Sequence, residues 1–202
     1  MKKIGIMGGS FDPPHIGHLL MAETVKEELK LDFVIFIPTG KTGYKNKNTS
    51  CENRFNMVSL AIANREGFIN SDIEIKRDGY TYTADTLNEL NMSYADSQLY
   101  FIVGADSLDY MEKWKDPARV FEQCNVVAVN RKGYNDFIMK EKAEELYNKF
   151  SADITFVHMP TIDISSTEIR DRIKNKQDTS TLIPQDVRNF IDNYNIYGED
   201  NV

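Results

Sequence analysis

Short apolar runs alternate with longer segments of helical periodicity along nearly the whole chain. Several runs have no polar residue at their centre, as in Phe-Val-Ile-Phe-Ile at 33–37 and Val-Val-Ala-Val at 126–129. Uninterrupted apolar runs are typical of parallel strands that helices cover on both faces. The strands predicted in this way span 3–7, 32–37, 69–76, 98–103, 125–130 and 153–158.

Between these runs, apolar positions recur three and four residues apart, which predicts helices. The helical segments lie near 17–30, 52–64, 84–92, 107–123 and 137–150. A last helix is expected over 184–197, with Val187, Phe190, Ile191 and Tyr194 as its packing face. This alternation predicts an α/β, Rossmann-like fold with a doubly wound, mainly parallel sheet in a single domain. Ligands of such sheets bind beyond the carboxyl ends of the strands.

Composition narrows the class of protein. A chain of 202 residues, 41% of them hydrophobic, can bury a full core, and its net charge of -7 argues against a nucleic-acid or membrane-surface partner. Cys51 and Cys124 are far apart and fit neither a disulfide framework nor a metal site. Because no apolar run suits a signal peptide or a membrane helix, we expect a cytoplasmic globular protein. The sequence leaves room for a homo-oligomer.

Segment 8–18, Gly-Gly-Ser-Phe-Asp-Pro-Pro-His-Ile-Gly-His, connects the first predicted strand to the first predicted helix. Gly8 and Gly9 let the backbone approach a bulky anion and direct N–H groups toward it. His15 and His18 stand three positions apart around the helix start, so both can face one ligand. Exposed amides, a helix N-terminus and two imidazoles are typical of a phosphate site. We refer to segment 8–18 as the phosphate turn.

A second candidate segment begins at Ser165. Ser165 followed by Glu168 is a capping box, so an ordinary helix start is the simplest interpretation. However, Ser165 and Ser166 also offer hydroxyl donors to phosphate oxygens, and Arg170 lies about one turn into the helix. A guanidinium there is suited to bidentate contact with a phosphate that the phosphate turn holds.

A zinc site is the competing interpretation of the histidines. His158 would lie on the same sheet edge as His15 and His18, and three histidines can hold a hydrolytic zinc. Such a site needs supporting carboxylates and gives no reason for the glycine turn or the serine pair. We therefore assign no protein residue as a metal ligand.

The pattern Gly-Ser-Phe-Asp-Pro-x-His-x-Gly-His, together with the later Ile-Ser-Ser-Thr-x-Ile-Arg, resembles the nucleotidylyltransferase superfamily. Segment 77–87 and segment 101–107, the latter followed by Trp114, resemble bacterial nicotinate-nucleotide adenylyltransferases in particular. The resemblance covers nearly the whole chain. It implies one nucleotidylyltransferase domain over 1–202, with C-terminal helices over 165–197 packed on it.

The resemblance implies transfer of the adenylyl group of ATP to nicotinate mononucleotide, giving nicotinate adenine dinucleotide and pyrophosphate in NAD biosynthesis. The attacking phosphate is already an anion, so catalysis needs positioning and charge stabilisation rather than a strong base. Mg²⁺ is expected as cofactor, held mainly by ATP phosphates and water. The implied residues are His15, His18 and Arg170 for catalysis; Gly8, Gly9, Ser10, Phe11, Gly104, Asp106, Ser165 and Ser166 for ATP; and Lys45, Tyr82, Thr83 and Trp114 for the acceptor.

Several of these residues have plainer interpretations. Asp106 suits a ribose hydroxyl or an N-cap for 107–114, and Trp114, the single tryptophan, suits ring stacking or the core. Lys45 lies in the polar segment 39–53, where the family often has Pro-Pro-His-Lys and this chain has Thr-Gly-Tyr-Lys, with Tyr44 in place of the histidine. Whether that segment closes on substrate is left open. Arg54 suits either a phosphate contact or a solvated residue at a helix start, and the solvated residue is the expectation.

Two other functions share the phosphate motifs. Phosphopantetheine adenylyltransferases have both, but they lack the segments at 77–87 and 101–107 and are usually shorter. A non-catalytic nucleotide sensor is the second alternative, although a degenerate site would be expected to have lost a histidine, the serine pair or Arg170. The preference for nicotinate over nicotinamide mononucleotide cannot be read from composition.

Overall fold

A computed structural model describes residues 1–41, 49–131, 136–160 and 162–198. Its strands are β1 (Lys2–Gly9), β2 (Phe33–Pro38), β3 (Phe68–Asn70), β4 (Ser97–Gly104), β5 (Asn125–Arg131) and β6 (Ile154–Met159). They form one sheet in the order β3-β2-β1-β4-β5-β6, in which β4 pairs in parallel with β1 and β5, and β5 with β6. This order reverses direction between β1 and β4, as in a doubly wound sheet. The predicted fold class is confirmed.

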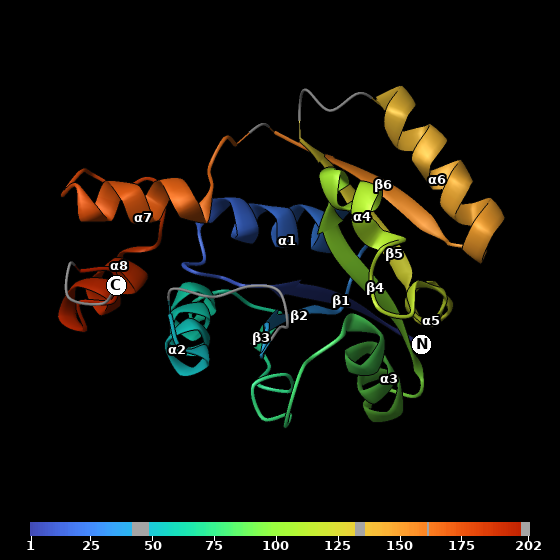
Figure 1. The fold of residues 1–202 in the computed structure, drawn as a ribbon, viewed down its shortest axis with the longest axis horizontal. Helices are drawn as coiled ribbons and strands as arrows, with labels where there is room; N and C mark the ends of the chain where they lie inside the picture. The colour runs from blue at the N-terminus through green and yellow to red at the C-terminus, as the bar shows by residue number, and fades with distance from the viewer. Residues whose placement is uncertain (42–48, 132–135, 161, 199–202) are drawn as a thin grey trace. The chain divides into compact units, whose positions relative to one another are not determined.

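The helices follow the strands as the alternating pattern predicted, and Figure 1 labels them along the chain. They are α1 (Ile16–Glu28), α2 (Cys51–Ile62), α3 (Thr83–Ser93), α4 (Leu108–Met111), α5 (Pro117–Gln123), α6 (Asp136–Phe150), α7 (Ser166–Lys174) and α8 (Gln185–Asn193). A 3-10 turn, η1 (Ala105–Ser107), precedes α4. Among the described residues, no helix combines the length and the apolar character that a membrane span requires.

The chain packs as two compact units. Unit 1 comprises Met1–Met7, Met21–Ile35 and Thr81–Thr161. Unit 2 comprises Gly8–Leu20, Phe36–Tyr80 and the residues from Ile162 onward. Each unit therefore contains its own part of the predicted site: the phosphate turn and α7 belong to unit 2, and the residues around α3 and α4 belong to unit 1.

The core of unit 1 forms around β5. Val126, Val127, Ala128 and Val129 are all 0% exposed, as expected for an apolar strand in the interior of a parallel sheet. Burying each valine side chain contributes roughly 1.5–3 kcal/mol relative to leaving it in water. Helices α5 and α6 of the same unit pack against each other.

Two predicted elements were wrong in extent. The strand expected over 69–76 ends at Asn70, because the backbone turns where Lys76 N donates to Asp72 O at 2.9 Å. The helix expected over 107–123 breaks after α4. Asp116 adopts a left-handed conformation (φ 51°) immediately before Pro117, and residues that precede proline are disfavoured in the helical region.

In unit 2, α8 packs against α2, and its residues Val187 and Ile191 are 0% and 1% exposed. The expected contribution of Tyr194 was wrong, because its side chain is 67% exposed. Instead the chain reverses at Asn195 (φ 47°) and buries Ile196 and Tyr197. This reversal determines where Tyr197 lies.

Candidate functional site

The phosphate turn runs from the end of β1 to the start of α1, and its two histidines lie together. Their rings stack with centroids 3.6 Å apart. The backbone N–H of His15 donates to Nδ1 of His18 at 3.2 Å. An accepting Nδ1 places the proton of the neutral His18 ring on Nε2, the donor that a phosphate oxygen needs. His15 itself is 4% exposed, so the turn holds it in place.

Phe11 shapes the turn from within. It is 2% exposed and takes a left-handed conformation, φ 48°, which is uncommon for a residue with a bulky side chain. Its ring meets His18 edge-on at 5.1 Å. A Cβ atom at Gly9 would lie 3.1 Å from the Phe11 ring, so the glycine makes room for that ring against the backbone.

Arg54 of α2 holds the turn from the side. Its guanidinium donates to the carbonyl oxygens of Ser10 at 2.9 Å and Thr39 at 2.6 Å, and its side chain is 0% exposed. It also donates to the Thr49 carbonyl at 3.4 Å and to Cys51 Sγ at 3.1 Å.

The expectation of a solvated Arg54 was therefore wrong. Arg54, Met57, Val58 and Ala61 are buried together on one face of α2. The spacing of these positions, three and four residues apart, was a signal in the sequence that could have placed the arginine inside.

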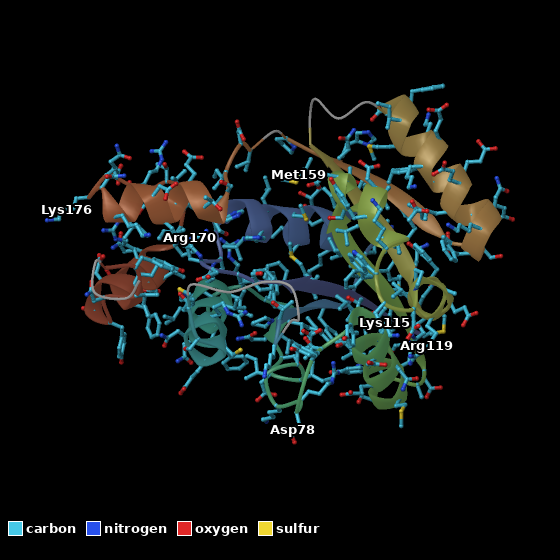
Figure 2. All side chains as sticks on the ribbon, in the orientation of Figure 1. Asp78, Lys115, Arg119, Met159, Arg170 and Lys176 are labelled. Atoms are coloured by element: carbon cyan, nitrogen blue, oxygen red, sulfur yellow. The ribbon has the colours of Figure 1, made fainter. Side chains whose placement is uncertain are left out.

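Helix α7 is tied to the phosphate turn by two hydrogen bonds. Ser166 Oγ donates to Pro13 O at 2.9 Å, and Arg170 Nη1 donates to Asp12 O at 2.8 Å. Figure 2 labels Arg170 on this helix. Ser165 caps the helix by accepting from Glu168 N at 3.1 Å, so the capping interpretation of Ser165 is confirmed. Capping and phosphate contact remain compatible, because the N–H groups of the first helical turn have no acceptor within the helix.

Tyr197 was not identified from the sequence. Its hydroxyl donates to Asp12 Oδ1 at 2.8 Å, and its side chain is 3% exposed. Burial, followed by the negative charge of Asp12, raises the pKa of Tyr197 well above its ordinary value, so the phenol stays protonated and remains a donor. No local motif marks this residue, because its partner lies 185 positions earlier.

Unit 1 holds a second group of predicted residues. Gly104 ends β4, and Asp106 follows it in η1 with an exposed side chain. The N-cap interpretation of Asp106 was wrong, because Gly104 and Ser107 occupy the cap positions of η1 and α4. Trp114 is half-buried, and its ring lies edge-on to Phe101 at 5.9 Å, so it is not a fully buried core residue.

Tyr82 and Thr83 lie at the start of α3. Tyr82 is the N-cap residue, is 36% exposed, and makes no side-chain capping bond. Thr83 is the first helical residue and is half-buried. The N-terminus of α3 therefore presents first-turn amides that its cap residue does not satisfy through its side chain.

Two further sequence predictions concern Lys45 and a metal site. Lys45 and Tyr44 lie outside the described residues. Within the described part of the chain, no group of three or more histidine, cysteine, aspartate or glutamate residues is arranged to hold a metal ion. His158 Nε2 instead lies 3.4 Å from Asp136 Oδ1, on the surface of unit 1.

A family model and named sequence relatives match most of this chain. The family model described as cytidylyltransferase-like matches residues 6–172. A protein of Lachnoclostridium phytofermentans named "Probable nicotinate-nucleotide adenylyltransferase" is 41% identical over 199 residues, covering 98% of this chain and 100% of its own. One of the same name from Clostridium novyi is 42% identical over 199 residues, with coverage of 98% and 100%.

Solved structures share the fold. The nicotinic acid mononucleotide adenylyltransferase of Plasmodium falciparum complexed with NaAD aligns with a TM-score of 0.81 at 21% identity, over 98% of both chains. The complex of the same enzyme with APC aligns with a TM-score of 0.77 at 20% identity, again over 98% of both chains. At these identities the likeness establishes the architecture.

Proposed function

We propose that this chain, which belongs to the nicotinate-nucleotide adenylyltransferase family, transfers the adenylyl group of ATP to nicotinate mononucleotide. The products are nicotinate adenine dinucleotide and pyrophosphate, in the synthesis of NAD. The observation that carries the proposal is the full-length identity of 41% to relatives named for this reaction. The phosphate turn, with α7 bonded to it, suits the chemistry independently.

The phosphate turn binds the triphosphate in this proposal. The backbone amides of Gly8, Gly9 and Ser10 donate to its oxygens, and the N-terminus of α1 adds its dipole. Phe11 keeps the turn in shape from behind. His18 donates from Nε2 to the α-phosphate, where negative charge builds as the new bond forms, and His15 supports it by stacking.

The start of α7 binds the distal phosphates. The hydroxyl of Ser166 already donates to Pro13 O, so the contribution of the serine pair comes from first-turn N–H groups and from the Ser165 side chain. Arg170 uses Nη1 on Asp12 O and Nη2 on Thr167 Oγ1. Its guanidinium has five N–H donors, and the remaining ones stabilise the departing pyrophosphate.

Unit 1 residues recognise ribose and the acceptor. The Asp106 carboxylate accepts from ribose hydroxyls, and Gly104 leaves space for it, because a Cβ at Gly104 would lie 2.5 Å from Asp106 Oδ1. Trp114 stacks on the pyridine ring. The amides at the start of α3, near Tyr82 and Thr83, bind the nicotinate carboxylate as helix N-termini bind anions. Lys45 is assigned to the acceptor phosphate.

Mg²⁺ is the proposed cofactor, bound through the triphosphate and water, where it neutralises phosphate charge. Magnesium at nucleotide sites typically keeps several waters and needs few protein ligands, so no protein residue is assigned to it. We further propose that the enzyme works in the cytoplasm. Its two cysteines are both free thiols, which fits a reducing compartment.

Pyrophosphate release tests the proposal directly. The protein is supplied with ATP and Mg²⁺ and, in parallel reactions, with nicotinate mononucleotide, nicotinamide mononucleotide or phosphopantetheine. We expect fast turnover with nicotinate mononucleotide, and its loss when EDTA removes the metal. Turnover with phosphopantetheine alone would reassign the acceptor. Tight ATP binding with no release from any acceptor would indicate a nucleotide sensor.

A further inference from the structure

The end of α8 delivers Tyr197 to the interior of unit 2 by a defined helix stop. Ile196 N donates to Ile191 O at 3.0 Å, and Asn195 N donates to Asp192 O at 3.3 Å. With Asn195 in the left-handed region (φ 47°), these bonds form a Schellman motif. The motif reverses the chain, so Tyr197 points inward while Tyr194, on the last turn of α8, stays in solvent.

The site that receives Tyr197 is buried and polar. Asp12 is 5% exposed, and its Oδ1 accepts the Tyr197 hydroxyl at 2.8 Å. Met57 Sδ lies 4.0 Å from the same hydroxyl. A carboxylate in such a place is costly to leave without donors.

Arg170 also bonds to Asp12, through the backbone. Its Nη1 donates to the backbone oxygen of Asp12 at 2.8 Å, so the guanidinium is already held at this residue. Besides burial, the charge of Asp12 raises the pKa of the Tyr197 phenol, and the charge of Arg170 lowers it. Tyrosine, carboxylate and guanidinium therefore form one interacting group.

We propose that Tyr197 is a positioning residue for adenylyl transfer, which satisfies the Asp12 carboxylate and so keeps the Arg170 guanidinium directed to the nucleotide phosphates. Arg170 is a cation already bonded to Asp12, so its guanidinium can turn to the Asp12 carboxylate when the bond from the hydroxyl is lost. A guanidinium that pairs with its neighbour's carboxylate has fewer donors for phosphate. This inference rests on the proposed function.

The test removes the Tyr197 hydroxyl alone. Tyr197→Phe keeps the buried ring, and Tyr194→Phe is the matched control, because Tyr194 is 67% exposed. Wild type must first turn over ATP with nicotinate mononucleotide; if it does not, the proposed function fails rather than this inference. Assays are run well below the unfolding temperature of each variant, so that a loss of stability alone leaves the rates unchanged.

We expect Tyr197→Phe to lower kcat/KM for ATP about tenfold or more, the range for losing a hydrogen bond to a charged group. KM for nicotinate mononucleotide should stay within about twofold of wild type. In the control Tyr194→Phe, both kcat/KM for ATP and KM for nicotinate mononucleotide should stay within about the same range. Wild-type constants in folded Tyr197→Phe would overturn the inference and restrict the tyrosine to a structural role.

A second variant separates the positioning of Arg170 from a general loss of packing around Tyr197. Asp12→Asn removes the negative charge that would attract Arg170. If Tyr197 acts as proposed, adding Tyr197→Phe to Asp12→Asn has less than about a twofold further effect. If Tyr197→Phe alone folds poorly, its effect on kcat/KM in the Asp12→Asn background decides between a positioning role and a structural role. Equal effects of Tyr197→Phe in both backgrounds would overturn the inference.

Discussion

The phosphate turn and the acceptor residues of unit 1 are built in different ways. The turn is held by hydrogen bonds from residues 44, 153, 158 and 185 positions away, and Asp12 and His15 are buried. Tyr82 is exposed, and Trp114 is half-buried. The groups assigned to the chemical step are hydrogen-bonded within unit 2, whereas the side chains assigned to acceptor recognition are in contact with solvent. Preorganised donors at a reacting centre need little reorganisation during the reaction.

The largest effect is expected at the turn itself. His18→Ala removes the donor assigned to the α-phosphate and should lower kcat by about a hundredfold or more. ATP affinity, measured by calorimetry, should change little, because the amides and Arg170 still hold the triphosphate. His158→Ala is the control, since its side chain is 65% exposed on unit 1. Undiminished turnover in His18→Ala would remove that histidine from the mechanism.

The next effect concerns stability. Arg54→Met keeps an apolar stem but withdraws the donors to Ser10 O and Thr39 O, and we expect the free energy of unfolding to fall by about 3 kcal/mol. Urea denaturation measures it. The control Arg119→Met removes a half-exposed ion pair with Asp85, which typically contributes less than about 1 kcal/mol. Equal losses of unfolding free energy in the two variants would mean that buried Arg54 contributes no more to stability than Arg119 at the surface.

A smaller and more selective effect is expected in unit 1. Trp114→Ala should raise KM for nicotinate mononucleotide roughly tenfold, the range for losing a ring stack, and leave KM for ATP unchanged. Because the chain has one tryptophan, its fluorescence also reports binding in the wild type. Nicotinate mononucleotide should quench it. If Trp114→Ala instead raised KM for ATP, the assignment of Trp114 to the acceptor would be contradicted.

The smallest effect is a pH-dependent one at a surface cluster. Hydrogen bonds from Lys149 and Lys142 lower the pKa of Glu112. A lowered carboxylate pKa stabilises the fold above the unfolded-state pKa, about 4.3, and this contribution is lost as pH falls through the folded-state pKa. Glu112→Gln should therefore melt slightly below wild type at pH 7, and the two melting temperatures should converge at acid pH. Turnover at pH 7 should be the same for both.

Much of the fold could be predicted because its signals are local. The apolar run at 126–129 marks a buried strand without reference to any other segment. The phosphate turn and the Ser165 cap are likewise local motifs. By contrast, the order of strands in the sheet depends on which distant runs pair, and the strand expected over 69–76 failed because a turn begins at Asp72.

The missed site residues share a physical reason. The spacing along α2 could place Arg54 on the buried face, but nothing local identifies its acceptors, Ser10 O and Thr39 O. Tyr197 reaches Asp12 only because Asn195 takes a left-handed conformation, and asparagine does so in a minority of its occurrences. Contacts between residues far apart along the chain leave no spacing pattern to recognise.

The bond between Tyr197 and Asp12 has a consequence for synthesis, since it joins positions 185 residues apart. A ribosome that adds about 5–20 residues per second finishes the phosphate turn about 10–40 s before it reaches the tyrosine. Throughout that interval the nascent chain lacks the hydroxyl that donates to Asp12. A polypeptide released early would contain both phosphate motifs and still lack the side chain that secures the first of them.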